Sequence, residues 1–215
     1  MINRKGMMMK KAIFMLLLAT IATTAAMAQG RTGSVSVTPM AGGTLTNLVG
    51  KDATGYSSKV GLVAGAELAY QLSPKLALSG GALYSMEGCK TNKSTEPKIN
   101  LEYVNVPILA NFYFIKGLVV KTGLQPSFLT RARINADGGI YTDINVRDMF
   151  HAVDLSLPVG LSYEVSNFVV DARYNIGLTK ATKSSYSAFG DNYTDEPNSI
   201  RNSVFQLTIG YKINL

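Results

Sequence analysis

The sequence predicts an all-β protein, an eight-stranded antiparallel up-and-down transmembrane β-barrel. Three observations predict this fold. Long segments alternate between apolar and polar residues with period two, which is typical of strands. Several segments exceed about ten residues, which is long for a soluble sheet but suits a strand that crosses a bilayer at a tilt. The connections alternate between tight turns and long polar segments, as in outer-membrane barrels.

The clearest pair of strands forms a hairpin over residues 101–128. In its first strand, one face is apolar and the other mixes aromatic, amide and aliphatic residues. The apolar face comprises Val104, Val106, Ile108, Ala110, Phe112 and Phe114, and the opposite face comprises Tyr103, Asn105, Pro107, Leu109, Asn111 and Tyr113. Lys116-Gly117 predicts a tight turn. The second strand then alternates from Leu118 to Phe128.

The remaining strands follow from the same alternation. They are predicted at about residues 33–46, 59–72, 75–88, 148–165, 168–179 and 203–215. Ser73-Pro74 and Ser166-Asn167 predict two more tight turns. The long polar connections are predicted at about residues 47–58, 89–98, 132–147 and 180–202. An even number of strands places both chain ends on the periplasmic side and the long loops outside the cell.

The chemistry of the two faces predicts which one points outward. The polar face is rich in Gly, Ser, Thr and Asn with isolated charges, whereas the apolar face has almost no charge. A membrane barrel turns its apolar face to lipid, with aromatic girdles at both interfaces. The predicted periplasmic girdle comprises Tyr70, Phe112, Phe114, Tyr163, Phe168 and Tyr211, and the outer girdle comprises Tyr84, Phe128 and Phe150. The alternative is a soluble lipocalin-like barrel with the faces inverted.

Charged residues occupy the predicted inner face. They are Glu67, Glu87, Lys121, Asp154, Asp171, Arg173 and Lys212. An eight-stranded barrel has an interior just wide enough for side chains, and an unpaired buried charge is costly. We therefore expect an ion-pair and hydrogen-bond network that plugs the lumen. A gated polar path through the same residues is the alternative.

The first 28 residues are expected to be a signal peptide, and residues 29–215 the barrel domain. Basic residues precede an apolar stretch, Ala12 to Ala22, and Ala26-Met27-Ala28 resembles a cleavage site. Four of the 21 basic residues and none of the 14 acidic residues precede Gln29, so the formal charge of +7 falls to +3 in the mature chain. No basic run with interleaved aromatic residues suggests nucleic acid as a partner.

The sequence offers no catalytic, cofactor-binding or metal-binding motif. His151 is the single histidine, and Ser156 lies on the same predicted strand, which leaves a lipid-modifying hydrolase as a rival hypothesis. Cys89 is the single cysteine, so an internal disulfide is excluded. We expect a non-enzymatic protein with no cofactor and no metal.

The last long connection is the candidate extracellular recognition loop. Its aromatic and acidic residues are Tyr186, Phe189, Asp191, Tyr193, Asp195 and Glu196. Tyrosine beside short polar residues makes a good recognition surface. The sequence thus predicts a monomer in outer-membrane lipid, with a structural or surface-recognition role and an extracellular ligand or envelope protein as a partner. A narrow transporter is a further alternative.

The hairpin also resembles a known family. Its Leu101-x-Tyr103-Val104-x-Val106-Pro107 start and the later Gly117-Leu118-x-x-Lys121-x-Gly123-Leu124-Gln125-Pro126 stretch resemble the PorT-like group of porin-family outer-membrane β-barrel proteins. The resemblance implies a small barrel in the outer membrane of a Gram-negative bacterium, similar to the barrel domains of outer-membrane proteins X and A. Such small barrels are mostly not open channels. It also implies an accessory role in secretion as an alternative function.

Overall fold

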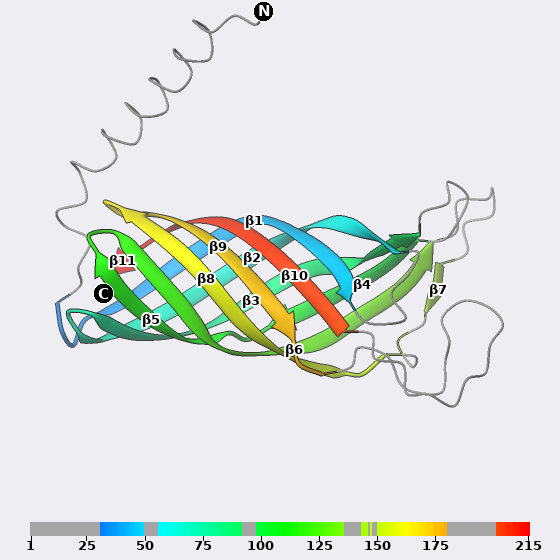
Figure 1. The fold of residues 1–215 in the computed structure, drawn as a ribbon, viewed down its shortest axis with the longest axis horizontal. Coiled ribbons are helices and arrows are strands. Elements are labelled where there is room, and N and C mark those ends of the chain that lie inside the picture. Colours follow the sequence, from blue (N-terminus) through cyan, green and yellow to red (C-terminus); the bar gives the residue numbers. More distant parts are fainter. Residues whose placement is uncertain are drawn as a thin grey trace, which may run out of the picture.

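The strands close into an antiparallel barrel, which confirms the predicted fold class (Figure 1). The computed structural model describes residues 31–49, 56–91, 98–135, 143–145, 147, 150–179 and 201–215. The strands are β1 (Val35–Val49), β2 (Tyr56–Ser73), β3 (Leu76–Thr91), β4 (Lys98–Asn105), β5 (Ile108–Ile115), β6 (Leu118–Asn135), β7 (Asp143–Asn145), β8 (Val153–Val165), β9 (Phe168–Gly177), β10 (Arg201–Tyr211) and β11 (Ile213–Asn214).

The barrel closes where the first strand meets the last. β1 pairs with β2 on one side and with β10 on the other, in a register that runs from Met40 opposite Gly210 to Val49 opposite Arg201. The short β11 continues this pairing, with Val37 opposite Ile213. Because both edges are paired, the wall leaves no free sheet edge along these strands.

A proline divides one of the barrel strands into β4 and β5. Pro107 has no backbone N–H and therefore interrupts the hydrogen-bond ladder. The wall nevertheless continues through this point. The Val106 N–H donates to the Pro126 carbonyl oxygen at 2.9 Å, and the Pro107 carbonyl oxygen accepts from the Gly81 N–H at 3.0 Å.

Three tight turns and the C-terminus lie at one end of the barrel, which we call the turn end (Figure 1). The turns join β2 to β3, β5 to β6 and β8 to β9. Gly117 has φ +80° in the second turn and Ser166 has φ 53° in the third. Such left-handed values match the turn types that fit the twist of a hairpin. β7 lies at the opposite end, which we call the far end.

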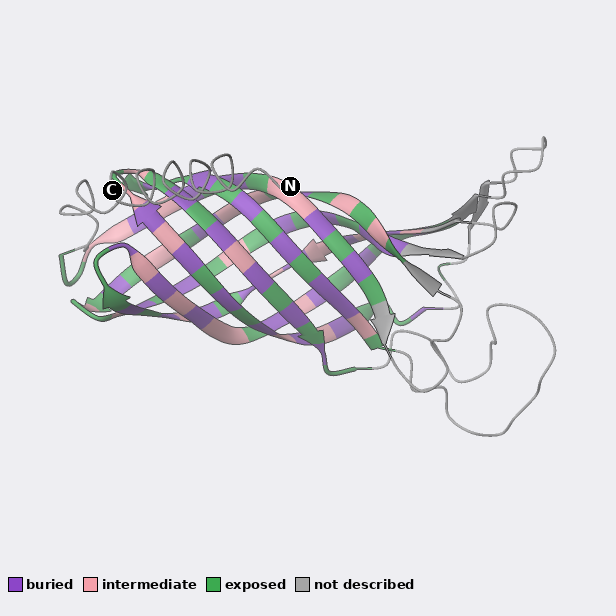
Figure 2. Cartoon of the chain, turned by 45° about the horizontal axis from the view of Figure 1, so that its top comes forward, coloured by how far each residue is buried: buried purple, intermediate pink, exposed green. Residues whose placement is uncertain are grey.

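Burial alternates along the strands, so one face points into the lumen and the other points outward (Figure 2). In β10, Leu207 is 49% exposed and Ile209 is 62% exposed, whereas Gln206 and Thr208 are each 1% exposed. The apolar face is therefore the outward face, as predicted. In the described parts of the chain, no helix is long and apolar enough to cross a membrane.

The aromatic residues predicted at the turn end are exposed, except Tyr163, which is half-buried, and the prediction at the far end is partly wrong. At the turn end, Phe168 and Tyr211 are exposed, with ring centroids 5.3 Å apart in an edge-to-face arrangement. Phe150, however, is 7% exposed and does not belong to an outer girdle. β8 begins at Val153 rather than at residue 148. Phe150 therefore precedes the strand, and the alternation along β8 does not determine whether the Phe150 side chain points inward or outward.

β1, β2, β3 and β6 extend further at the far end than the sequence predicts, whereas β8 and β9 are shorter there. β1 reaches Val49, β2 begins at Tyr56 and β3 reaches Thr91. β6 continues to Asn135 and pairs with β7 inside a predicted loop. Backbone pairing needs no apolar side chain, so the ladders continue where the apolar alternation has ended.

Candidate functional site in the barrel lumen

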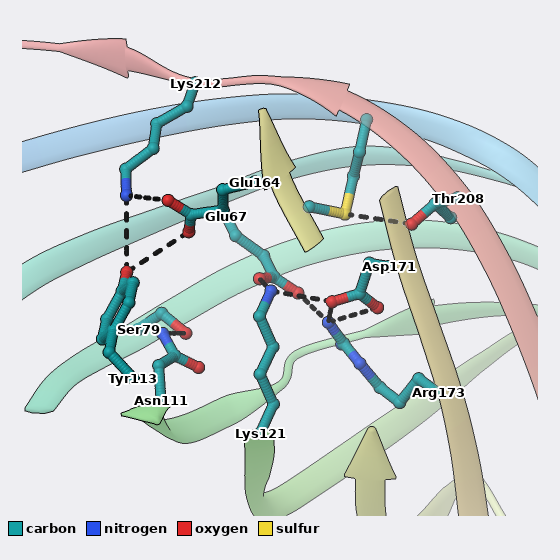
Figure 3. A network of polar contacts seen from close by, with 11 residues as sticks. Glu67, Ser79, Asn111, Tyr113, Lys121, Glu164, Asp171, Arg173, Thr208 and Lys212 are labelled. Carbon is teal, nitrogen blue, oxygen red and sulfur yellow. Dashed lines mark hydrogen bonds and ion pairs between the residues drawn. The ribbon is translucent and has the colours of Figure 1, made fainter. Parts of the chain in front are cut away.

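Four charged residues meet inside the barrel and form what we call the central quartet: Glu67, Lys121, Asp171 and Arg173 (Figure 3). Lys121 Nζ lies 3.3 Å from Glu67 Oε2 and 2.8 Å from Asp171 Oδ2. Arg173 Nη2 lies 2.6 Å from Glu67 Oε1 and 3.2 Å from Asp171 Oδ1. All four residues are buried, and their formal charges cancel.

The quartet spans the lumen because its members come from strands that are not neighbours. Glu67 lies on β2, Lys121 on β6, and Asp171 and Arg173 lie on β9. Asp171 and Arg173 are two residues apart, so the period of the strand places both side chains on the inner face. β1 and β10 separate β2 from β9, and β8 separates β9 from β6. The ion pairs therefore connect parts of the wall that have one or two strands between them.

A second group lies nearer the turn end and consists of Tyr113, Glu164 and Lys212 (Figure 3). Lys212 Nζ lies 2.8 Å from Glu164 Oε2. The Tyr113 hydroxyl donates to Glu164 Oε1 at 3.3 Å, and Lys212 Nζ donates to the same hydroxyl at 3.3 Å. Lys212 Nζ also lies 5.5 Å from the centroid of the Tyr113 ring.

A third group lies toward the far end, around Glu87 and Asp154. Glu87 accepts hydrogen bonds at its side chain from Ser85 Oγ at 3.0 Å, Asn105 Nδ2 at 3.4 Å and Asn202 Nδ2 at 2.7 Å. The Tyr103 hydroxyl donates to Asp154 Oδ2 at 2.9 Å. Glu87 and Asp154 are the carboxylates of this group, and the Lys59 ammonium lies beside it, on the Glu87 carbonyl oxygen.

Small cavities lie on the two sides of the quartet. The outer cavity, toward the far end, is lined by residues that include Glu87, Gln125, Asp154 and Asn175. The inner cavity, toward the turn end, is lined by residues that include Glu67 and Lys121. Each cavity has a volume of about 20 Å³, which is room for about one water molecule.

The structure places all seven charged residues of the expected network inside the barrel, each at most 9% exposed. They do not form one continuous network: four make the quartet, Lys212 joins the group at the turn end, and Glu87 and Asp154 lie in the outer layer. Sequence reasoning missed the partners Glu164, Tyr113, Tyr103, Asn105 and Asn202. Glu164 shares its face of β8 with Asp154, and that alternation is the signal that marks it as an inward residue.

The residues of the rival hydrolase hypothesis are not brought together. Ser156 is buried, and its hydroxyl donates to the Gln125 carbonyl oxygen at 3.3 Å. His151 is exposed, before β8 begins. In the part of the chain that the structure describes, no hydrogen bond joins them, and no group of three or more His, Cys, Asp or Glu side chains is placed to hold a metal ion. The candidate recognition loop, with Tyr186 to Glu196, lies outside the described residues, as does the expected signal peptide.

Comparison with solved structures finds small outer-membrane barrels. Neisserial surface protein A is 15% identical, with a TM-score of 0.53 over 83% of this chain and 97% of that one. Ail, the attachment invasion locus protein of Yersinia pestis, in its complex with the heparin analogue sucrose octasulfate, is 15% identical, with a TM-score of 0.50 over 85% of this chain and 100% of that one. At these identities the likeness concerns the fold alone. No curated protein sequence matches this chain.

A family model described as the outer membrane protein beta-barrel domain matches residues 27–183, which is more than half of the chain. That match agrees with the closed antiparallel barrel and its apolar outward face. The chain therefore belongs to the outer membrane protein beta-barrel domain family.

Proposed function

We propose that this protein is a non-conducting outer-membrane barrel that serves as a structural or surface-recognition protein of the envelope. The observation that carries the proposal is the central quartet. Its four side chains connect β2, β6 and β9 across the lumen, and the two cavities beside them in the described part of the chain are small. A lumen crossed by short ion pairs resists the passage of ions. We therefore expect the function to depend on the outer surface of the barrel.

The outer surface has a specific candidate for recognition in residues 184–196. Tyr186, Phe189 and Tyr193 supply aromatic contact area, and Asp191, Asp195 and Glu196 supply acceptors for hydrogen bonds. The sequence places this loop between β9 and β10, whose described ends lie at the far end of the barrel. The proposed partner is an extracellular ligand or an envelope protein that offers hydrogen-bond donors or positive charge.

The proposal includes export and location. Cleavage after Ala28 would release residues 29–215 for insertion as a monomer into the outer membrane of a Gram-negative bacterium. The resemblance of the hairpin over residues 101–128 to PorT-like proteins extends the proposal to an accessory role in secretion.

Conductance in a planar lipid bilayer tests the closed lumen. The wild-type barrel is expected to give no steady conductance above the bare membrane. Arg131→Ala is the matched control, because Arg131 is an exposed arginine outside the lumen, 3.8 Å from Glu102. A steady wild-type conductance that changes in Arg173→Ala or Lys121→Ala, but not in Arg131→Ala, would overturn the proposal in favour of a narrow transporter.

A further inference from the structure

The outer cavity presents more hydrogen-bond acceptors than donors. Four oxygen atoms of its lining have no hydrogen-bond partner, namely Gln125 Oε1, Asp154 Oδ1, Asn175 Oδ1 and Asn202 Oδ1, against one donor in the same state, Asn175 Nδ2. Gln125 and Asn175 are each 2% exposed. A buried polar atom without a partner is energetically unfavourable, so acceptors gathered at one cavity indicate something bound there that they can contact.

Neighbouring bonds fix the orientation of one amide in this lining. Asn202 Nδ2 donates to Glu87 Oε2 at 2.7 Å, so its oxygen must remain the free acceptor. Asn105 is held in the same way, since its Nδ2 donates to Glu87 Oε1 and its oxygen also lacks a partner. Glu87 thus turns two amide oxygens away from itself. The orientation of these two amides therefore follows from their bonds to Glu87.

Two carboxyl groups and one ammonium group lie in this layer. Glu87 and Asp154 both line the outer cavity, and the quartet nearby is already neutral within itself. Lys59 brings one positive charge to the same layer, where its Nζ donates to the Glu87 carbonyl oxygen at 2.7 Å and to Asn100 Oδ1 at 2.6 Å. One ammonium group against two carboxylates leaves a formal charge of −1 among these three residues.

We propose that the outer cavity binds one hard cation of the size of Ca²⁺ through Glu87, Asp154 and the amide oxygens of Gln125 and Asn175. Carboxylate and amide oxygens are the ligands that Ca²⁺ uses, in flexible arrangements of six to eight. The cavity has room for one such ion or one water molecule. A bound water molecule would contact the free acceptors but would leave the formal negative charge uncompensated. A bound cation would contact the acceptors and also compensate the charge. This site goes beyond the proposed function and needs neither conductance nor an external ligand.

Luminescence of Tb³⁺, a Ca²⁺ substitute, tests the site directly in the full chain refolded in non-ionic detergent. The chain contains no Trp, so excitation energy must come from tyrosine. Tyr103 lines the cavity, and its hydroxyl donates to Asp154 at 2.9 Å. We expect saturable Tb³⁺ luminescence that Ca²⁺ displaces, and a rise of the thermal unfolding midpoint when Ca²⁺ is added to the wild-type protein.

Three variants locate the ion. Asp154→Asn is expected to weaken Tb³⁺ binding by at least about tenfold, since the loss of a partner that only orients a metal ligand already costs about 10–100-fold. Glu102→Gln removes a carboxylate that contacts Arg131 on the outward surface and should leave binding unchanged. The combined Asp191→Asn, Asp195→Asn and Glu196→Gln variant should also leave it unchanged. Heat-dependent gel mobility shows that each variant is folded.

Three results would overturn the proposal. Absence of saturable Tb³⁺ binding to the wild-type protein would mean that the cavity holds water only. Loss of binding in either control variant as large as in Asp154→Asn would place the ion elsewhere. If Asp154→Asn does not fold, Asn175→Ala takes its place, and unchanged binding in that variant together with no wild-type Ca²⁺ shift in unfolding would also contradict the site.

Discussion

Arg173 and Glu67 are 106 residues apart in the chain, yet Arg173 Nη2 lies 2.6 Å from Glu67 Oε1 inside the barrel. The contact joins β9 to β2 with two strands between them in the wall. It forms only once the sheet has closed, so it is a marker of the closed barrel as well as part of its plug.

Arg173→Ala should destabilise the folded barrel by about 3–5 kcal/mol, because it leaves Glu67 and Asp171 as buried carboxylates with one cation between them. Equilibrium unfolding by denaturant, in detergent or lipid vesicles, measures the loss. Arg131→Ala is the control. Arg131 is 62% exposed at its side chain and 3.8 Å from Glu102, so its removal should cost less than about 1 kcal/mol. Equal losses in the two variants would contradict the role of the quartet.

Glu164 and Lys212 should be energetically coupled. Their side chains lie 2.8 Å apart and are both buried at the turn end. A double-mutant cycle with Glu164→Gln and Lys212→Met should give a coupling energy of about 0.5–3 kcal/mol, as residues in one buried network do. Additive losses would show that the pair contributes nothing jointly. A cycle that combines Glu164→Gln with Arg131→Ala serves as the uncoupled reference.

Gly42 and Gly43 are adjacent glycines that should differ sharply in tolerance. A Cβ atom at Gly42 would lie 2.0 Å from the Leu207 carbonyl oxygen, which is backbone and cannot move aside without disturbing the β1–β10 seam. A Cβ atom at Gly43 would lie 3.7 Å from its nearest neighbour, the Gly61 carbonyl oxygen, in ordinary contact. Gly42→Ala should therefore lower the yield of refolded barrel in a gel-mobility assay, and Gly43→Ala should not. Equal yields would contradict the close approach at the seam.

A positive charge on the lipid face should cost most in the middle of the apolar band. Leu207 is an outward residue of β10 with apolar outward residues on either side, so Leu207→Arg should destabilise the barrel by about 2–4 kcal/mol. Val60 is the last apolar outward residue before Ser58 at the far end of β2, and Val60→Arg should cost about 0–1 kcal/mol. Unfolding from lipid vesicles compares them. A larger loss at Val60 would mean that the apolar band is misplaced.

Much of the fold could be predicted because strand alternation assigns each residue to a face. The pattern of residues 101–128 placed Tyr103, Asn111 and Lys121 inward, and each is buried. Ends of strands were less predictable. β3 reaches Thr91 through polar residues, since backbone pairing leaves no mark on side-chain polarity. Phe150 was assigned to an outer girdle only because its strand was drawn too long.

The partners inside the lumen could be predicted only as a set. Alternation shows that Glu67, Asp171 and Lys212 point inward, but the pairing depends on the tilt and stagger of the closed barrel. The tilt and the stagger determine which inward residues lie at the same height along the barrel axis. They place Lys212 beside Glu164 rather than beside Asp171. Excess acceptors around Asn175 and Gln125 likewise emerge only from three-dimensional contacts.

Gel mobility of the outer-membrane fraction in detergent, with and without boiling, tests the closed barrel most directly. We expect the unboiled protein to resist detergent and to migrate differently from the boiled protein, because the closed barrel stays folded with its apolar face outward. A single unshifted band in the soluble periplasmic fraction would contradict it. The apolar band of exposed residues, Leu207 and Ile209 among them, would then have no lipid to face.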